Sequence, residues 1–173
     1  MAGVSPDFLT RVFQKVDKDR SGAISAQELQ GALSNGTWEP FSSSTVHILL
    51  SMFDQNKSGT INFQEFGALW KYISDWQNVF KNFDRDNSGA IDTSELKSAL
   101  TSFGYRLSDE TFRLISQRFS KKNESCIRFD DFIHCCVMMH NVTESFKKYD
   151  TDMDGVVTLH YEQFVQLMFS TQV

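Results

Sequence analysis

The chain has 173 residues, of which 17 are Lys or Arg and 22 are Asp or Glu, so its formal net charge is -5. This length suits one ordinary globular domain or two small ones, and 16 Phe residues provide material for a core. The acidic balance argues against nucleic-acid binding through phosphate contacts, because that binding depends on clustered Lys and Arg. The N-terminus lacks a basic segment followed by an apolar one, so we expect no secretory signal and no membrane span.

The Cys and His residues and the known catalytic motifs give no support for a disulfide framework, a zinc site or an enzyme. Cys126, Cys135 and Cys136 are too few and too poorly spaced for a disulfide framework or a zinc site, which favours a reduced, intracellular chain with buried thiols. The four His residues show no ligand spacing. No Ser-His-Asp, Walker-type or Rossmann pattern is present, so we do not expect an enzyme.

A twelve-residue repeat recurs along the chain. Residues 17–28 read D-K-D-R-S-G-A-I-S-A-Q-E, residues 54–65 read D-Q-N-K-S-G-T-I-N-F-Q-E, and residues 84–95 read D-R-D-N-S-G-A-I-D-T-S-E. Two weaker copies are S-K-K-N-E-S-C-I-R-F-D-D at 120–131 and D-T-D-M-D-G-V-V-T-L-H-Y at 150–161. Three copies with Gly, Ile and Glu in the same register are too regular to be isolated turns.

The first three copies fit the calcium loop of the EF-hand. Calcium is a hard cation that takes six to eight oxygen ligands, and this spacing turns oxygens at positions 1, 3, 5, 7 and 12 toward one point. Gly at position 6 supplies the sharp turn, and Glu at position 12 can offer two oxygens. The candidate metal ligands are Asp17, Asp19, Ser21, Ala23 and Glu28; Asp54, Asn56, Ser58, Thr60 and Glu65; Asp84, Asp86, Ser88, Ala90 and Glu95; and, in the fifth loop, Asp150, Asp152, Asp154 and Val156.

The number of carboxylates in each loop gives an order of expected calcium affinity. We expect the first and third loops to bind most tightly, and the second, whose charged ligands are Asp54 and Glu65, to bind more weakly. The fifth loop places Tyr161 at position 12 and should bind weakly or prefer magnesium. The fourth loop, 120–131, is degenerate because Lys122 and Arg128 stand where ligands belong, so we expect it to bind no ion.

Loop spacing predicts an all-α fold of about eight helices with short paired strands in the loops. The second and third loops start 30 residues apart, as do the fourth and fifth, which leaves room for one shared helix in each interval. The longer intervals hold two helices separated by breakers at 35–40 and 103–105. Ser25 with Glu28 predicts a capping box, and Ser108 opens the helix before the fourth loop.

Five hands cannot all pair within one chain, because EF-hands pair two by two through a short antiparallel strand at positions 7 to 9. We expect the fifth hand to pair with the fifth hand of a second chain, forming a two-fold dimer through residues around 150–170. Five hands at these intervals, with segments such as W-K-Y-I-S-D-W-Q-N-V-F and Y-D-T-D-M-D-G, resemble the penta-EF-hand family. The resemblance implies a single domain over residues 1–173 and a homodimer or heterodimer through the fifth hand.

The predicted helix 63–83 carries a broad apolar face. At 100° per residue its apolar positions span roughly 200°, about twice the width of a minimal core-facing stripe. Two interpretations remain open: the helix is buried on two sides, or part of the face is an aromatic groove that opens to solvent and binds peptides.

The resemblance implies the second interpretation for part of this face. Proteins of that type are calcium-dependent adaptors that hold Pro-rich peptides, and the matching pocket positions are Phe66, Trp70, Ile73, Phe103 and Tyr161, with Leu33 and Trp38 nearby. Such peptides suit an aromatic groove, because polyproline segments are already extended and lose little entropy on docking. The resemblance also implies that calcium at the third hand moves Arg106 in the following connector and uncovers the pocket.

Together these observations predict a calcium sensor and adaptor that reaches membranes only through its partners. The partners that the resemblance implies are Pro-rich segments of endosomal-sorting (ESCRT) accessory proteins, of the secretory (COPII) coat and of annexins. It implies roles in endosomal sorting, ER-to-Golgi transport and apoptosis, in the cytoplasm or nucleus and peripherally at ER exit sites and endosomes. Two alternatives stay open: a regulatory subunit of a calpain-like protease, and a plain calcium buffer whose hands barely open.

Overall fold

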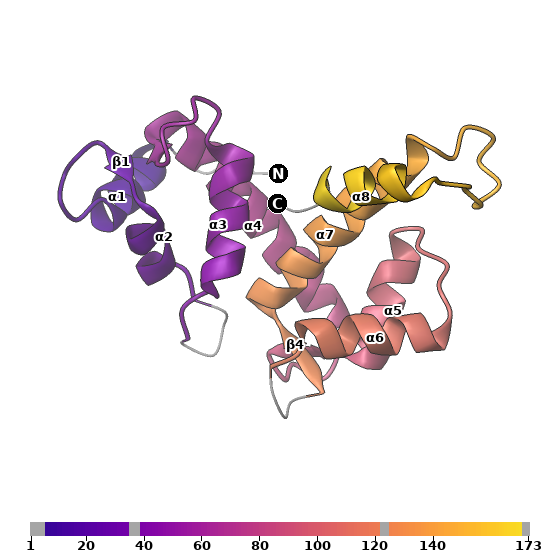
Figure 1. Cartoon of the computed structure of the whole chain (residues 1–173). Coiled ribbons are helices and arrows are strands. Elements are labelled where there is room, and N and C mark those ends of the chain that lie inside the picture. Colours follow the sequence, from indigo (N-terminus) through magenta and orange to yellow (C-terminus); the bar gives the residue numbers. More distant parts are fainter. Residues whose placement is uncertain (1–5, 35–38, 122–124, 171–173) are drawn as a thin grey trace. The chain divides into compact units, whose positions relative to one another are not determined.

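The fold consists of helices joined by calcium-loop segments and short strands, as the loop spacing predicts (Figure 1). The computed structural model describes residues 6–34, 39–121 and 125–170. Within them lie α1 (Pro6–Val16), β1 (Ala23–Ile24), α2 (Ala26–Ala32), α3 (Ser43–Phe53), β2 (Ile61–Asn62), α4 (Phe63–Phe83), β3 (Ala90–Asp92), α5 (Thr93–Ser102), α6 (Asp109–Phe119), β4 (Cys126–Arg128), α7 (Phe129–Lys147) and α8 (Tyr161–Ser170). The chain forms two compact units, residues 1–133 and 134–173, and each is described by itself.

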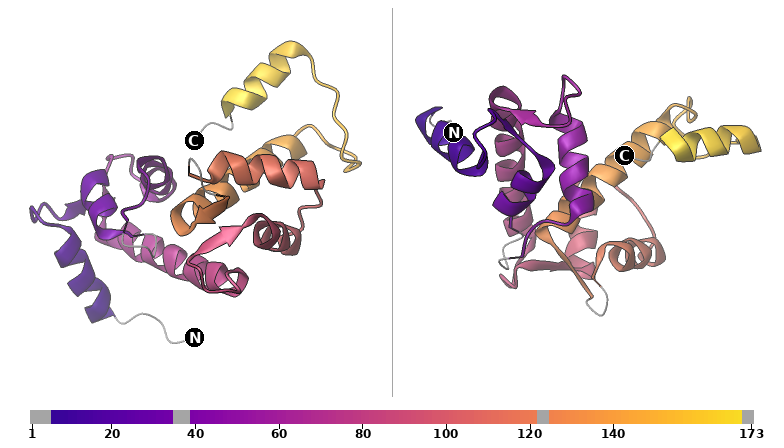
Figure 2. Two further views of the ribbon diagram at one scale, coloured as in Figure 1. Left: turned by 90° about the horizontal axis from the view of Figure 1, so that it is seen from below. Right: turned by 60° about the vertical axis from the view of Figure 1, so that its left-hand side comes forward.

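The two shared helices are present where the short intervals predict them. α4 begins at Phe63, at the end of the second loop, where Asn62 and Glu65 form a capping box, and it ends at Phe83, just before Asp84, the first residue of the third loop. Figure 2 shows α4 from two further sides, running from the first pair of hands toward β3. α7 likewise leads from the fourth loop toward the fifth. The predicted capping box of Ser25 with Glu28 and the predicted cap at Ser108 are both confirmed.

Loop strands join the first four hands into two pairs. β1 pairs antiparallel with β2, placing Ile24 opposite Ile61, and β3 pairs with β4, placing Ile91 opposite Ile127. All four Ile side chains are fully buried. Position 8 is therefore apolar because its side chain fills the space between two paired loops.

Aromatic contacts tie both hand pairs of the first unit to α4. The Phe13 ring of α1 meets the Phe66 ring edge-on at a centroid distance of 5.5 Å, and Trp76 meets Phe132 at 5.8 Å. The fully buried side chains include Phe41, Phe66, Phe112, Phe132, Leu29, Leu49, Leu69, Leu96 and Leu100. These contacts show that the broad apolar face of α4 serves mainly as core on two sides.

The second unit contains most of α7 together with the fifth loop and α8. Cys135 and Cys136 are free and buried there, as the sequence predicts, and burial raises the pKa of the Cys135 thiol to about 12. Cys126, in the first unit, is free but only partly buried, so the prediction of its burial is wrong. In the part of the chain that the structure describes, none of the helices is both long and apolar enough to cross a membrane.

Two leucines on neighbouring helices test how much the core contributes to stability. Leu100 on α5 is fully buried, whereas Leu114 on α6 is 59% exposed. We expect Leu100→Ala to lower the free energy of unfolding by about 3 to 5 kcal/mol, because it removes buried apolar surface and leaves a cavity. Leu114→Ala should change it by less than about 0.5 kcal/mol. Urea unfolding in chelator measures both, and equal effects of the two substitutions would contradict this packing.

Candidate functional site

The first and third loops each gather three carboxylates around one point. In the first loop, oxygens of Asp17, Asp19 and Glu28 all lie within 4.8 Å of one another, and the third loop groups Asp84, Asp86 and Glu95 in the same way. Two oxygens on opposite sides of a calcium ion, each about 2.4 Å from it, would be separated by about this distance. Both loops therefore fit a calcium ion in the arrangement that they already have.

Hydrogen bonds within the loop hold these oxygens in position. One Asp17 carboxylate oxygen accepts from the Ser21 backbone N–H at 2.9 Å, and the other accepts from Gly22 N–H at 3.0 Å. The Ser21 hydroxyl donates to the Ala23 carbonyl oxygen at 2.9 Å, so the ligand atoms of positions 5 and 7 lie side by side. The second and third loops repeat this pattern.

The glutamate at position 12 attaches the exiting helix to the loop in each of the first three hands. Glu28 Oε1 accepts from Lys18 N–H at 2.8 Å, and Oε2 accepts from Ser25 N–H at 2.9 Å. Glu65 and Glu95 make the equivalent two bonds at 2.9 to 3.1 Å. A movement of this carboxylate therefore moves the first turn of the helix that carries it.

The sharp turn of each loop depends on left-handed backbone conformations. Gly22 has φ +83° and Gly89 has φ +81°, and an added Cβ would meet no heavy atom within 4 Å at either. Glycine is favoured there by the backbone angle rather than by lack of space. Position 4 is also left-handed although it is not glycine, as Arg20 at φ 59° and Lys57 at φ 57° show.

Local hydrogen bonds favour the ionised form of three of the loop carboxylates. The hydroxyl and backbone N–H of Ser21 lower the pKa of Asp19, and the equivalent groups of the third loop lower the pKa of Asp86. The backbone N–H and hydroxyl of Ser25 lower the pKa of Glu28. Negative charge at these positions at neutral pH is the form in which carboxylates bind calcium.

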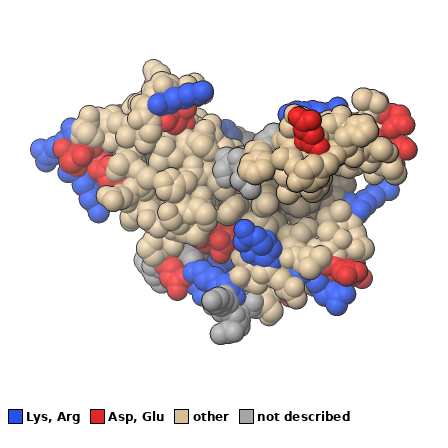
Figure 3. All heavy atoms as spheres, viewed as in Figure 1, with Lys and Arg blue, Asp and Glu red and all other residues tan. Residues whose placement is uncertain are grey.

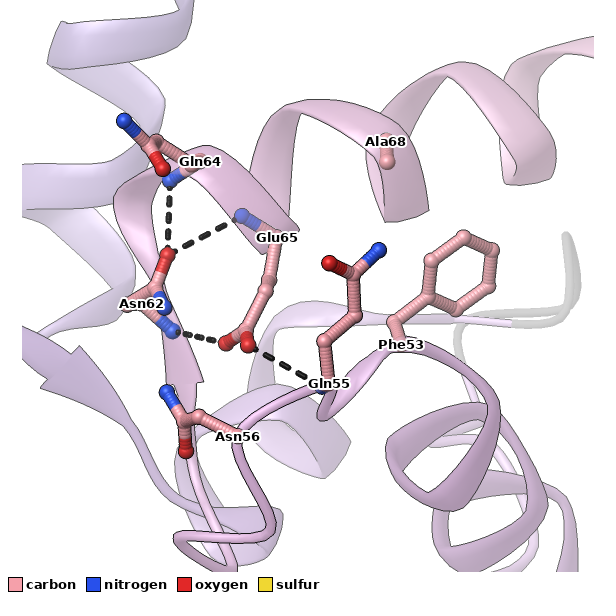
Figure 4. A pocket seen from close by; sticks show the side chains of 7 residues that line it. All are labelled: Phe53, Gln55, Asn56, Asn62, Gln64, Glu65 and Ala68. Atoms are coloured by element: carbon pink, nitrogen blue, oxygen red, sulfur yellow. Dashed lines mark hydrogen bonds between the residues drawn. The ribbon is translucent and has the colours of Figure 1, made fainter.

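The second loop is built like the other two but has fewer charges. Its position-12 residue Glu65 is buried, and the amides of Asn56 and, at position 9, Asn62 stand where the third loop has the carboxylates of Asp86 and Asp92. Figure 4 shows these residues beside a recess of about 420 Å³ that Phe53 and Ala68 close on its apolar side. The Asn62 side chain in that view accepts from the backbone N–H groups of Gln64 and Glu65, so it caps α4 as well.

The fourth loop uses its cations to bind a carboxylate of the same chain. Glu39 Oε2 lies 2.9 Å from an Arg128 guanidinium nitrogen and also pairs with Lys121. Arg128 and Lys121 thus pair with the charge of a residue more than 80 positions earlier in the chain. The prediction that Lys122 obstructs a ligand position falls outside the described residues.

The fifth loop differs from its predicted arrangement at the closing position. Asp150, Asp152 and Asp154 gather their carboxylate oxygens within 4.8 Å, as predicted for its acidic half. α8, however, begins at Tyr161, and the residue that bonds back to the N–H before the helix is Gln163, whose Oε1 accepts from His160 N–H at 2.9 Å. In the first three hands the corresponding residue is glutamate. Gln163 is a site residue that sequence reasoning missed, because the helix starts later than the repeat predicts.

The predicted peptide-pocket residues lie in different environments. Phe66, Ile73 and Leu33 are buried in the core, and Trp70 is half-buried with the ring of Phe8 at 6.0 Å. Phe103, at the end of α5, is 41% exposed and meets the rings of Trp76 and Phe83 edge-on, each at 5.9 Å.

Arg106, Tyr161 and Trp38 complete the predicted pocket set. Arg106 is exposed in the connector after α5, and Tyr161 is 82% exposed in the second unit. Trp38 lies outside the described residues. Among the described residues of the first unit, the exposed aromatic surface is therefore narrower than the predicted groove, and it centres on Phe103.

Comparison with known proteins agrees with the loop geometry. The family model described as an EF-hand domain pair matches residues 7–71 and 73–136, and the model for a single EF hand matches residues 143–160. Sorcin from Schistosoma japonicum is 46% identical over 162 residues, which cover 94% of either chain. Human sorcin is 40% identical over 155 residues, covering 87% of this chain and 77% of sorcin. The chain belongs to the penta-EF-hand family.

Other relatives in the penta-EF-hand family differ in length. Human peflin is 40% identical over 159 residues, but this chain spans only 56% of peflin's length. The solved structure of a homologue of programmed cell death 6 protein from Leishmania major Friedlin superposes with a TM-score of 0.83 at 35% identity, covering 95% of this chain and 94% of that one. Segments such as Y-D-T-D-M-D-G resemble programmed cell death 6 protein already at the level of sequence.

This penta-EF-hand chain is thus a calcium-binding EF-hand protein, and the acidic clusters of its loops are compatible with that ion. Figure 3 shows Lys, Arg, Asp and Glu side chains in small, interspersed groups on the face drawn. Calcium, when bound, would supply positive charge at the centre of each oxygen cluster. The residues of the chain supply the cluster itself and its connection to the exiting helix.

The closing position of the fifth loop is testable by one substitution. We expect Gln163→Glu to raise the calcium affinity of this loop at least about tenfold, because it adds a negative charge and a second ligand oxygen. Calorimetric titration of the whole chain would resolve the added tight site. Glu162→Gln, one residue earlier on the same helix, is the matched control and should leave all sites unchanged. If Gln163→Glu behaved like the unaltered chain, the closing role of this residue would be wrong.

Proposed function

We propose that this chain is a calcium sensor and adaptor, without enzymatic activity, that captures Pro-rich segments of other proteins when calcium occupies its third loop. The first and third loops bind calcium most tightly, the second binds more weakly, and the fifth binds weakly or takes magnesium. The carboxylate content of the loops and their internal hydrogen bonds support this order.

One observation carries the proposal: α5 connects a calcium ligand to an exposed aromatic residue. Glu95 is the third residue of α5, and Phe103 follows the last residue of this ten-residue helix. A helix of that length is a stiff rod of about 15 Å, so a shift of its first turn reaches its other end. Phe103 and the nearby Arg106 are therefore placed to respond when calcium draws in Glu95, which is a local ion event that biases a two-state element.

Aromatic side chains at this end of α5 suit Pro-rich ligands. Phe103, Trp76 and Phe83 present ring edges and faces to one another, and Phe103 is partly open to solvent. Extended Pro-rich segments bind such surfaces at low entropic cost. As partners we propose Pro-rich regions of ESCRT-accessory, COPII-coat and annexin-type proteins, met in the cytoplasm or nucleus and at ER exit sites and endosomes, in vesicle trafficking and apoptosis.

The link between the third loop and capture is tested by Glu95→Ala. We expect this substitution to abolish calcium-dependent retention of a Pro-rich, Tyr-containing peptide, because the ion loses its bidentate ligand and α5 loses its connection to the loop. A pull-down with and without calcium measures it. Glu110→Ala, in the first turn of α6 and outside every loop, is the control and should retain capture. Equal capture in calcium and in chelator by the unaltered chain would contradict the proposal, and no capture in either condition would favour a calcium buffer.

We also propose that the fifth hand forms a dimer with the fifth hand of a second chain. Its support is the apolar surface of the second unit, where Val156, Phe164 and Phe169 are 70%, 51% and 71% exposed. In the described residues no strand is assigned in this loop, in contrast to the four paired ones. Its pairing edge is thus not used within the chain.

Sedimentation tests the dimer directly. We expect a dimer at micromolar concentration in calcium and a monomer for Phe169→Glu, because a charge in the interface opposes desolvation. Leu114→Glu, an equally drastic change at an exposed position of the first unit, should leave the dimer intact. A monomeric unaltered chain would contradict the proposal, and copurification of a protease chain would instead favour the calpain-type regulatory subunit.

A further inference from the structure

The linker between α2 and α3 is fastened to the fourth hand. Glu39 on the linker pairs with Lys121 and Arg128, and the Ser42 N–H at the start of α3 donates to Asp130 Oδ2 at 2.8 Å. We call these five residues the latch. They join positions more than 80 residues apart in the chain.

The buried half of the latch is its stronger part. Asp130 is 1% exposed, and its second carboxylate oxygen makes no hydrogen bond within the described residues, so the Ser42 N–H is an important compensation for burying the charge. The Thr45 hydroxyl adds a bond to the Asp130 carbonyl oxygen at 3.3 Å. Arg128 is 17% exposed, whereas Lys121 is 41% exposed, and exposed ion pairs contribute little.

On one side the latch reaches the first calcium loop. The Phe41 carbonyl oxygen accepts from the Gln30 side chain at 2.9 Å, and the Phe41 N–H donates to the Leu33 carbonyl oxygen at 3.2 Å. Gln30 belongs to α2, whose first turn contains the ligand Glu28. Because α2 has only seven residues, a shift of Glu28 moves the whole helix and the linker bonded to it.

On the other side the latch reaches the third calcium loop. Arg128 lies on β4 directly opposite Ala90 on β3. Ala90 is the position-7 residue of the third loop, and its carbonyl oxygen already accepts from the Ser88 hydroxyl at 2.9 Å. A continuous series of hydrogen bonds, ion pairs and strand contacts therefore runs from Glu28 to the ligand oxygen of Ala90.

We propose that Glu39 and Asp130 are positioning residues for calcium binding, and that the degenerate fourth hand serves to couple the first and third loops. Calcium at the first loop fixes α2 and the linker, the latch then fixes β4, and the paired β3 presents the Ala90 carbonyl in its binding position. The third loop then loses less conformational entropy when it binds its ion. Calcium at the first loop therefore raises the calcium affinity of the third loop. The coupling rests on calcium binding by the two loops and does not require peptide capture.

A double-mutant cycle tests the coupling. The Gly22 and Gly89 backbone N–H groups each donate to the first Asp of their loop, so their NMR signals report the two loops separately during a calcium titration. With an intact latch, we expect Glu28→Gln to weaken calcium binding at the third loop at least about fivefold. In a chain that already carries Glu39→Gln or Ser42→Pro, Glu28→Gln should change the calcium affinity of the third loop by less than about twofold. By linkage, Glu95→Gln should weaken the first loop by the same factor, and that effect should also depend on the latch.

A second readout uses the metal-free protein. In chelator, Glu39→Gln and Ser42→Pro should speed hydrogen exchange of the Val46 N–H, which donates to the Ser42 carbonyl oxygen in the first turn of α3. Asp75→Asn is the matched control, since it removes an exposed ion pair with Lys71 that touches no loop. Glu39→Asp, which keeps the carboxylate, should restore part of the coupling.

The outcomes separate the latch from metal binding itself. A Gly89 signal that does not respond to calcium in the unaltered chain would overturn both the assignment of the third loop and the coupling. A third loop that binds calcium with the same affinity before and after Glu28→Gln would overturn the coupling alone. If Glu28→Gln weakened the third loop equally in the Glu39→Gln and Ser42→Pro chains, the role of the latch in the coupling would be overturned.

Discussion

The architecture depends on one carboxylate that belongs to a loop and to a helix at once. In each of the first three hands, the position-12 glutamate accepts N–H groups from positions 2 and 9 of the loop while it occupies the third residue of the exiting helix. The same two oxygens are those that calcium requires. An ion therefore competes for a group that already sets the helix angle, and this competition is what can convert ion binding into a change of helix position.

The last two hands lack the position-12 glutamate, where the fourth has Asp131 and the fifth has Tyr161. In the fourth hand, Arg128 pairs with Glu39 of the linker and Asp130 accepts from the Ser42 N–H, so this loop binds another segment of the chain. In the fifth, the neutral Gln163 keeps the helix-capping bond without the charge. The fifth hand thus keeps the hydrogen bond that ties its helix to the loop but lacks the negative charge that the glutamate has in the first three hands.

The sequence predicts an interaction well when the residues that make it lie close together in the chain. The shared helix α4 and the caps at Ser25 and Ser108 are local, and loop spacing with short-range patterns predicts them correctly. Burial of Phe66 and Ile73 and the pairing of Ser42 with Asp130 depend on segments far apart in the chain, for which no local pattern exists. Gln163 was missed for a different reason, because the repeat fixes position 12 by counting while α8 begins at Tyr161.

Strand pairing gives the fourth hand a structural role beside the third loop. The third loop presents its position-7 carbonyl from β3, a strand of three residues, and so short a strand needs a partner to hold its backbone. β4 of the fourth hand is that partner, and Ile127 fills the space against Ile91 with no exposed surface. The third site is thus a property of two hands, although only one of them supplies the oxygens.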